Sequence, residues 1–196
     1  MAILSPSLVW PLLWCAVAVF TGTAVLAVTA HVRQHRVRAA ARRLAAPDAD
    51  QWIEDVSLRM LRRLNREPDL TPAARHVVSR ALVARLGESR LRREAHRGTW
   101  HGRIDALRVL ADSGVPTGAE QVAGGLHDPD QDVRAAAVAA LGRLGSRASV
   151  EALVQALQED CVAASRVATS IAVVGPTDAD PVVPLLRSRD ARLRYW

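Results

Sequence analysis

The strongest constraint on the fold is a sequence pattern that returns about every thirty residues. Glycines close helix-like segments at Gly114, Gly145 and Gly175, at spacings of 31 and 30 residues. The pattern DQDVR at 130–134 returns two periods later as DARLR at 190–194. Such a period is typical of helical solenoids, in which each helix pair buries its apolar face only against its neighbours. Solenoids present surfaces, so the period favours a binding scaffold over an enzyme.

The best-formed repeat lies at 128–157, where DPDQDVRAAAVAALGRLG is followed by a shorter helical segment, ASVEALVQAL. This sequence resembles HEAT repeats of the short bacterial type, akin to those of phycobilin lyases, and the resemblance extends over 98–196. It implies an all-α fold of stacked helix pairs. Because the likeness to the lyases lies in the repeat consensus and not in active-site residues, we expect no lyase activity.

The resemblance also assigns a structural role to the polar residues of the repeat. In the family, the arginine at the position of Arg134 faces along the stack and pairs with acids or carbonyls of adjacent repeats. The repeat that begins near Asp160 has Ala164 in place of this arginine. The predicted ladder comprises Arg103, Asp130, Arg134, Asp160, Asp190 and Arg194.

The first thirty residues contain no charged side chain. The apolar run at 8–30 would span about 35 Å as a helix, enough to cross a hydrocarbon core of about 30 Å. A cleaved signal peptide ending at Val28-Thr29-Ala30 is the alternative, but the run is long and lacks the charged segment that precedes a signal sequence. We therefore expect a single-pass anchor in a bacterial inner membrane, with the amino terminus outside and the repeats cytoplasmic.

Positive charge is concentrated directly after this run. Residues 31–97 contain sixteen arginines and eight acidic residues, a net charge of +8, whereas 98–196 contain ten arginines and twelve acidic residues, a net charge of −2. A basic segment beside a membrane favours contact with anionic lipid headgroups. Nucleic-acid binding is disfavoured because the repeats are slightly acidic. The proposed membrane-surface cluster is Arg33, Arg36, Arg38, Arg42 and Arg43.

Four segments follow from these patterns: an anchor at 1–30, a basic juxtamembrane helix at 31–47, a helical adaptor at 48–97 and HEAT-like repeats at 98–196. The adaptor is predicted to hold helices at 51–66 and from 72 to at least 86, with a charged continuation over 85–98 broken at Gly87. Thr117 and Glu120 have the spacing of a capping box. Because the pattern at 190–196 begins a further repeat, we expect the sequence to be part of a longer protein. Repeat helices are predicted near 100–112, 117–126, 131–144, 148–158, 161–174 and 180–187.

The candidates for chemistry are few. His31 and His35 share a helix face, but neighbouring arginines disfavour a metal cation. Cys161 has no histidine near it in sequence, so a packing role is favoured. Trp52 and Trp100 open helical units, and core packing is favoured over partner contact. The phosphate-loop, dinucleotide, zinc-hydrolase and nucleophile-elbow motifs are absent from the sequence. We therefore predict no catalytic, cofactor or metal site.

Together these features predict a membrane-anchored scaffold or regulatory adaptor that binds a protein partner through its repeats. By analogy of architecture, the expected partner is a membrane enzyme of envelope biosynthesis, such as a polysaccharide glycosyltransferase. One alternative is a lyase-like enzyme or a subunit whose solenoid holds a chromophore or cofactor. Another is a nucleic-acid-binding repeat protein.

Overall fold

The computed structural model describes residues 23, 26–29, 31–32, 34–44, 46, 49–174 and 180–195. The chain divides into two compact units, 1–43 and 44–196. In the first unit, the described residues from 26 to 43 are helical. No helix in the described part of the chain is both long enough and apolar enough to cross a membrane. Most of the apolar run at 8–30, together with Arg33, lies outside the described residues.

The second unit consists of helices joined by short turns, and no strand occurs among its described residues. This confirms the all-α prediction for the repeats. The helices are α2 (Ala49–Asp55), α3 (Leu58–Leu64), α4 (Pro72–Leu86), α5 (Glu88–Arg97), α6 (Trp100–Asp112), α7 (Gly118–Ala123), the 3-10 helix η1 (Gly124–His127), α8 (Gln131–Leu144), α9 (Arg147–Gln158), α10 (Ala164–Val174), α11 (Val183–Leu186) and α12 (Ala191–Tyr195).

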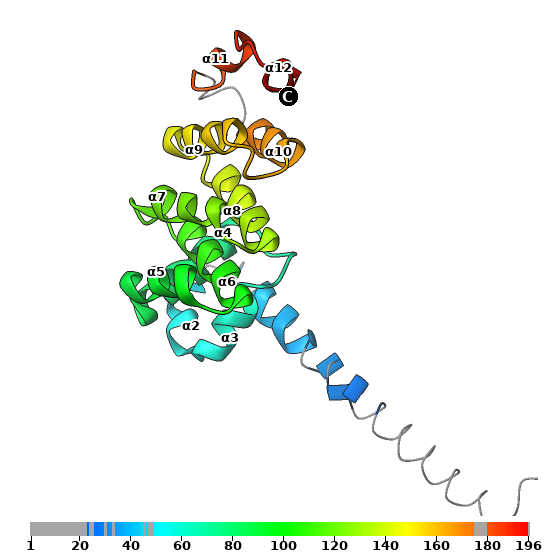
Figure 1. The fold of residues 1–196 in the computed structure, drawn as a ribbon. Coiled ribbons are helices and arrows are strands. Elements are labelled where there is room, and N and C mark those ends of the chain that lie inside the picture. The colour runs from blue at the N-terminus through cyan, green and yellow to red at the C-terminus, as the bar shows by residue number, and fades with distance from the viewer. Residues whose placement is uncertain are drawn as a thin grey trace, which may run out of the picture. The chain divides into compact units, whose positions relative to one another are not determined.

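Two columns of helices form the repeat region (Figure 1). In the first column, α6 packs against α8 and α8 packs against α10. In the second column, α7 packs against α9, and α5 contacts η1. The second column therefore includes α5, which the sequence patterns had placed in the adaptor. This two-layer arrangement of helix pairs is that of an α-solenoid.

The interior of the stack is filled by aliphatic side chains at helical spacing. In α8, Val133, Ala137, Val138 and Leu141 are almost fully buried. This spacing produces an apolar stripe on the helix. At Gly142 a Cβ would lie 3.0 Å from the Cβ of Ser170 and 3.1 Å from its carbonyl oxygen. Glycine at this position therefore allows α8 and α10 to pack closely.

Local sequence signals fix most helix ends. The side chains of Thr71, Thr99, Asp130 and Ser146 each accept a backbone N–H in the first turn of α4, α6, α8 and α9. Positive φ angles occur at Gly87 (80°), Gly114 (74°) and Gly145 (59°). These are the break predicted at Gly87 and two of the three periodic glycines; Gly175 lies outside the described residues.

Several predicted boundaries were wrong. The single helix expected at 51–66 is two helices, because Ser57 accepts the backbone N–H of Met60 and starts α3. The helix expected at 117–126 becomes α7 followed by η1. Thr117 makes no capping hydrogen bond, so the predicted capping box does not form. The helix expected at 180–187 is limited to α11.

The left-handed backbone at Gly145 leads to a test of the repeat pattern. We expect Gly145→Ala to lower the free energy of unfolding by about 1 kcal/mol, because a Cβ disfavours this conformation. Space is not limiting, since the nearest atom to a Cβ there would be Cγ1 of Val174 at 3.8 Å. Gly145→Asn should lower the free energy of unfolding by less, because asparagine tolerates a positive φ. Equal losses in urea unfolding for the two variants would contradict a backbone cause.

Candidate partner-binding surface

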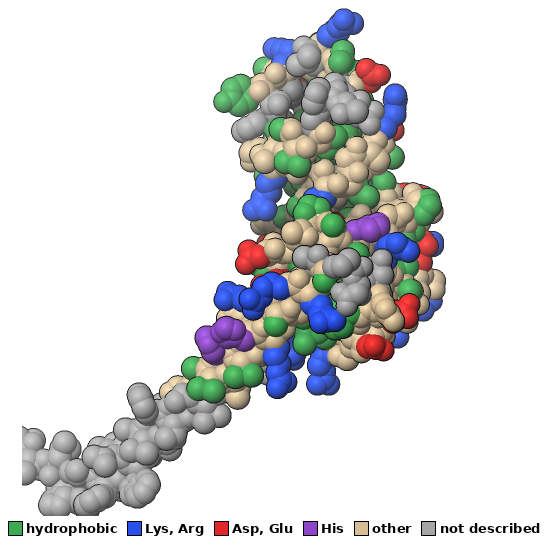
Figure 2. All heavy atoms as spheres, turned by 180° about the vertical axis from the view of Figure 1, so that it is seen from behind, with side chains coloured by type: hydrophobic (Ala, Val, Ile, Leu, Met, Phe, Trp, Pro, Cys, Tyr) green, Lys and Arg blue, Asp and Glu red, His purple; other side chains and the backbone are tan. Residues whose placement is uncertain are grey.

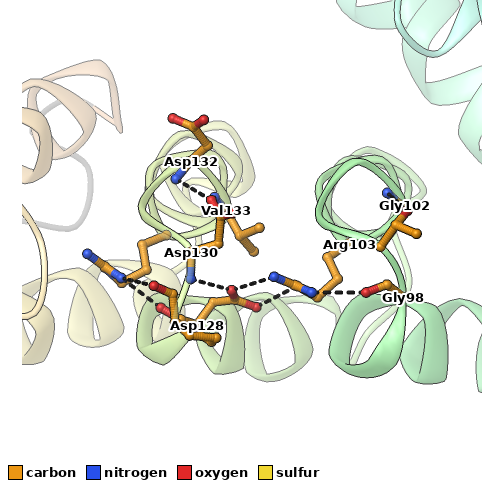
Figure 3. A network of polar contacts seen from close by, with 10 residues as sticks. Gly98, Gly102, Arg103, Asp128, Asp130, Asp132 and Val133 are labelled. Atoms are coloured by element: carbon orange, nitrogen blue, oxygen red, sulfur yellow. Dashed lines mark hydrogen bonds and ion pairs between the residues drawn. The ribbon is translucent and has the colours of Figure 1, made fainter.

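Consecutive repeats are joined by an ion pair between Arg103 and Asp128 (Figure 3). Arg103 Nη2 donates to Asp128 Oδ1 at 2.9 Å, and Nε lies 2.8 Å from Oδ2. Nη1 of the same guanidinium donates to the carbonyl of Gly98 at 2.9 Å. The two side chains are only 16% and 9% exposed. The pair therefore lies in a region of reduced solvation and connects the start of α6 to the turn before α8.

Asp128 and Asp130 organise the turn at the start of α8. Asp128 Oδ1 also accepts the backbone N–H of Asp130 at 2.9 Å. Asp130 Oδ1 in turn accepts the N–H of Asp132 at 2.8 Å and lies 3.4 Å from that of Val133. On the other side, Arg134 Nη1 donates to the carbonyls of Asp128 and Pro129 at 2.8 and 3.1 Å. One aspartate pair thus caps the helix and positions the acceptor of the inter-repeat ion pair.

The arginine geometry recurs along the chain. Arg103, Arg134 and Arg194 each donate from Nη1 to the carbonyl five residues earlier. Arg75, which no sequence pattern had singled out, donates from Nη2 to the carbonyl of Leu70 at 3.0 Å. In α4, α6 and α8 the arginine is the fourth residue after a capping Thr or Asp. The ladder arginines therefore hold the turn before their own helix, and within the described part of the chain only Arg103 among them also forms an ion pair with the next repeat.

The repeat around Asp160 departs from this geometry. Asp160 has a φ of 57° and follows the last residues of α9, whereas α10 begins only at Ala164. Val167 of α10 is fully buried, as Val133 of α8 is. The distance along the chain between these two valines is longer than the repeat period. α10 therefore starts later than the period predicts, and Ala168, which follows the buried Val167 as Arg134 follows Val133, is not an arginine either.

A second set of ion pairs lies along the stack. Arg62 binds Glu94 through two hydrogen bonds of 3.0 Å, which links α3 to α5. Arg66 donates to Asp105 of α6 from Nε at 2.6 Å. This hydrogen bond raises the pKa of Arg66. Arg143, near the end of α8, donates to Asp112 at the end of α6 at 3.0 Å. With Arg103–Asp128 at the other end, these contacts show that α6 and α8 run in the same direction.

A basic pocket opens where the ends of α6 and α8 meet the turn between α3 and α4. Its volume is about 200 Å³, and four arginines and two acidic residues line it, a formal charge of +2. Arg66 and Arg143 bind Asp105 and Asp112, and Arg75 binds backbone carbonyls. Arg108, half-buried in α6, has no hydrogen bond or ion pair within the described residues. Its guanidinium is available to a ligand. The lining is Asn65, Arg66, Glu67, Pro68, Arg75, Arg108, Asp112 and Arg143.

The second column has its own polar link. Glu88, the first residue of α5, accepts hydrogen bonds from Thr117 Oγ1 at 2.8 Å and from Gln121 Nε2 at 2.7 Å. The hydrogen bond from Gln121, followed by that from Thr117, lowers the pKa of Glu88. Thr117, predicted as a cap for its own helix, therefore joins two helices of the second column.

The remaining predicted residues lie apart from these contacts. Arg36, Arg38, Arg42 and Arg43 are exposed on the helix of the first unit. His31 and His35 meet edge to face with ring centroids 4.5 Å apart. The prediction that Trp100 packs in the core was wrong. Its side chain is 42% exposed and stacks on His101 at a ring-centroid distance of 3.4 Å. Trp52 is half-buried.

Figure 2 shows one face of the molecule, on which basic and acidic side chains are interspersed. Small apolar areas lie between them.

Comparison with known families supports the repeat assignment. Residues 89–173, from within α5 to near the end of α10, match a family model described as HEAT repeats. The matched region is less than half of the chain, and it corresponds to the part in which the two helix columns form. No curated protein and no solved structure matches the chain. HEAT repeats suggest a helical-repeat scaffold for protein interactions.

The two types of arginine contact lead to different stability effects. We expect Arg103→Ala to lower the free energy of unfolding by about 2–4 kcal/mol, because it leaves the poorly solvated Asp128 unpaired. Arg134→Ala should cost only about 1–2 kcal/mol, because it leaves two carbonyls that water can reach. Urea unfolding of the two variants tests this order. A larger loss for Arg134→Ala would place the main link between repeats elsewhere.

The lowered pKa of Glu88 leads to a pH prediction. The folded state holds the carboxylate charged, so its stabilisation is complete above the usual glutamate pKa of 4.5 and is lost as the pH falls through the lower folded value. Thermal melts from neutral pH into this acidic range should show a shallower loss of stability for Glu88→Gln than for the unchanged protein. Gln121→Leu, which removes the stronger hydrogen bond, should flatten the profile in the same way. Unchanged slopes in both variants would contradict the assignment.

Proposed function

We propose that this protein is a membrane-anchored adaptor that binds an acidic segment of a protein partner through the basic pocket of its repeats. The observation that carries the proposal is the free guanidinium of Arg108, set among three further arginines that are already held in place. A planar guanidinium binds a carboxylate through two parallel hydrogen bonds, which gives geometric selectivity as well as charge attraction. In this proposal the protein acts by binding its partner.

The pre-arranged charges support this role. Arg66 and Arg143 are fixed by Asp105 and Asp112, so little side-chain entropy is lost when a ligand enters. Each of these arginines retains donors beyond the ones used in its ion pair, since a guanidinium has five. With Arg75, which backbone carbonyls hold, an incoming carboxylate would thus meet one free guanidinium and three that are already oriented.

The amino-terminal sequence supports placing this adaptor at a membrane. An uncharged run of sufficient length precedes a cluster of arginines, which would contact anionic headgroups on the cytoplasmic side of a bacterial inner membrane. Anchoring confines both molecules to one surface and raises their effective concentration. The partner we favour is accordingly a membrane enzyme of envelope biosynthesis, such as a polysaccharide glycosyltransferase, with an acidic cytoplasmic segment.

Photo-crosslinking in cells tests the surface and the partner class together. A photoreactive amino acid at position 108 should capture a membrane protein through an acidic segment, identified by mass spectrometry of the crosslinked peptide. The matched position is 90, an exposed arginine of α5 outside the pocket. Identical products from positions 90 and 108, or a crosslinked peptide without acidic residues, would overturn the proposal.

Charge reversal gives the corresponding affinity prediction. Arg108→Glu should weaken binding of the captured segment at least tenfold, about 1.4 kcal/mol, because it places like charges together. Arg108→Lys should retain part of the affinity, since it keeps the charge and loses the planar fork. Arg90→Glu changes the net charge by the same amount and should leave the affinity within about twofold. Equal losses for Arg108→Glu and Arg90→Glu would indicate attraction by net charge alone.

A further inference from the structure

Three metal-binding side chains from two parts of the chain meet at the end of the second helix column. His127 is the last residue of η1, Glu159 follows the end of α9, and Cys161 lies two residues further on. One ligand atom from each of the three side chains lies within 4.8 Å of the others. His127 and Glu159 are 32 residues apart in sequence, so only the stacking of repeats brings them together. No sequence pattern had linked these residues.

We propose that His127, Glu159 and Cys161 form a binding site for a divalent transition-metal ion, with Zn²⁺ as the best match. Imidazole, thiolate and carboxylate are the three protein ligands that zinc uses, and they are the complete donor set here. Magnesium and calcium are disfavoured because they select oxygen ligands. The fourth tetrahedral position would be taken by water or by a group of a bound partner.

The existing contacts orient two of the ligands. His127 Nε2 lies 2.8 Å from Glu159 Oε2, and Gln155 Nε2 donates to the other carboxylate oxygen at 2.7 Å. The hydrogen bond from Gln155 is of the kind that holds a ligating carboxylate in place. Asp160, between Glu159 and Cys161, has a φ of 57°, which is uncommon for a residue other than glycine. This turn brings the Cys161 thiol back toward the carboxylate.

The distances require only a small adjustment. Metal–nitrogen and metal–oxygen bonds of about 2.0–2.1 Å and a metal–sulfur bond of about 2.3 Å place tetrahedral ligand atoms roughly 3.5 Å apart. The His127 and Glu159 atoms, which are 2.8 Å apart, would therefore separate by about 0.7 Å, and a pair at the 4.8 Å limit would close by about 1.3 Å. His127 and Glu159 are exposed, with side-chain exposures of 58% and 40%, so rotation of their side chains is not restricted by packing.

The local charges are compatible with a dication. Burial raises the pKa of the Cys161 thiol, and the negative charge of Glu159 adds to this effect. Binding would release the thiol proton to solvent, and the thiolate and carboxylate would then neutralise the ion. Arg134 lies near the thiol and opposes a cation, but two backbone carbonyls hold its guanidinium, and Asp160 adds a negative charge near the thiol.

Such a site would join two consecutive repeats, because η1 closes one helix pair and α9 closes the next. The ion would therefore act as a clamp on the second column, independent of the basic pocket. A bound metal stabilises the folded protein according to its free concentration and affinity. The expected readout is a rise in melting temperature with Zn²⁺ that depends on all three side chains.

Cobalt(II) titration of the full chain tests the site. The sequence has two cysteines, so Cys15→Ser leaves Cys161 as the sole thiol, and the protein is purified without a histidine tag. We expect one Co²⁺ per chain, with a thiolate-to-cobalt absorption band and tetrahedral visible bands that added Zn²⁺ removes. Cys161→Ser should abolish the band, and His127→Ala should weaken binding at least tenfold. His101 is an exposed histidine outside the cluster, so His101→Ala should leave both the absorption band and the cobalt affinity unchanged.

Two outcomes would overturn the proposal. One is the absence of a thiolate band although circular dichroism shows the folded helical protein. The other is a band whose titration midpoint is unchanged in both His127→Ala and Glu159→Gln, which would indicate metal bound by the thiol alone. The melting temperature gives an independent readout, since Zn²⁺ should raise it in the Cys15→Ser protein and not in the same protein with Cys161→Ser.

Discussion

The ion pair between Arg103 and Asp128 is the contact on which the order of the stack depends. It connects one first-column helix to the turn that starts the next, and the same carboxylate fixes the backbone of Asp130, which caps α8. A helix pair of this size cannot bury its apolar face alone, so its stability comes from its neighbours. Apolar packing between α6 and α8 supplies the driving force, and the ion pair restricts how the two helices can be aligned. An unpaired aspartate at this poorly solvated position would disfavour other alignments.

The sequence contains no lysine, so apart from histidine all of its basic side chains are arginines, and arginine serves two distinct purposes. At helix starts, the guanidinium donates to backbone carbonyls of the preceding turn and fixes the conformation of that turn. At helix ends, it pairs with aspartates of the neighbouring helix and lines the basic pocket. Because a guanidinium has five donors, structural pairing does not exhaust its capacity to bind a ligand. In our proposal, arginines that hold the solenoid together also recognise the acidic segment of a partner.

The sequence predicted the regular parts of the fold well because the repeat period and the caps report local physics. The bounds predicted for α6 and α8 coincide with those in the structure, and a break was predicted at Gly87, where φ is positive. The boundary between α2 and α3 at Ser57 was not predicted, because the helical apolar spacing continues across this serine and does not indicate a cap. Thr117 was misassigned because its true partner, Glu88, lies in another helix. The basic pocket and the His127–Glu159–Cys161 cluster could not be predicted from the sequence for the same reason: each combines segments that are far apart in sequence and meet only when helices stack. The apolar run at 8–30 lies mostly outside the described residues, and its role as an anchor stays a prediction.

Hydrogen exchange measured by mass spectrometry, on the unchanged protein and on Asp128→Asn, tests the central claim most directly. If the inter-repeat ion pair aligns the stack, the substitution should reduce amide protection in both α6 and α8, and also at the ends of these helices around Arg108 and Arg143. Protection in α3 and in the early turns of α4 should change little. A loss confined to the turn at 128–131, with α6 and the helix ends as protected as before, would contradict the account. It would mean that apolar packing alone sets the alignment of the repeats.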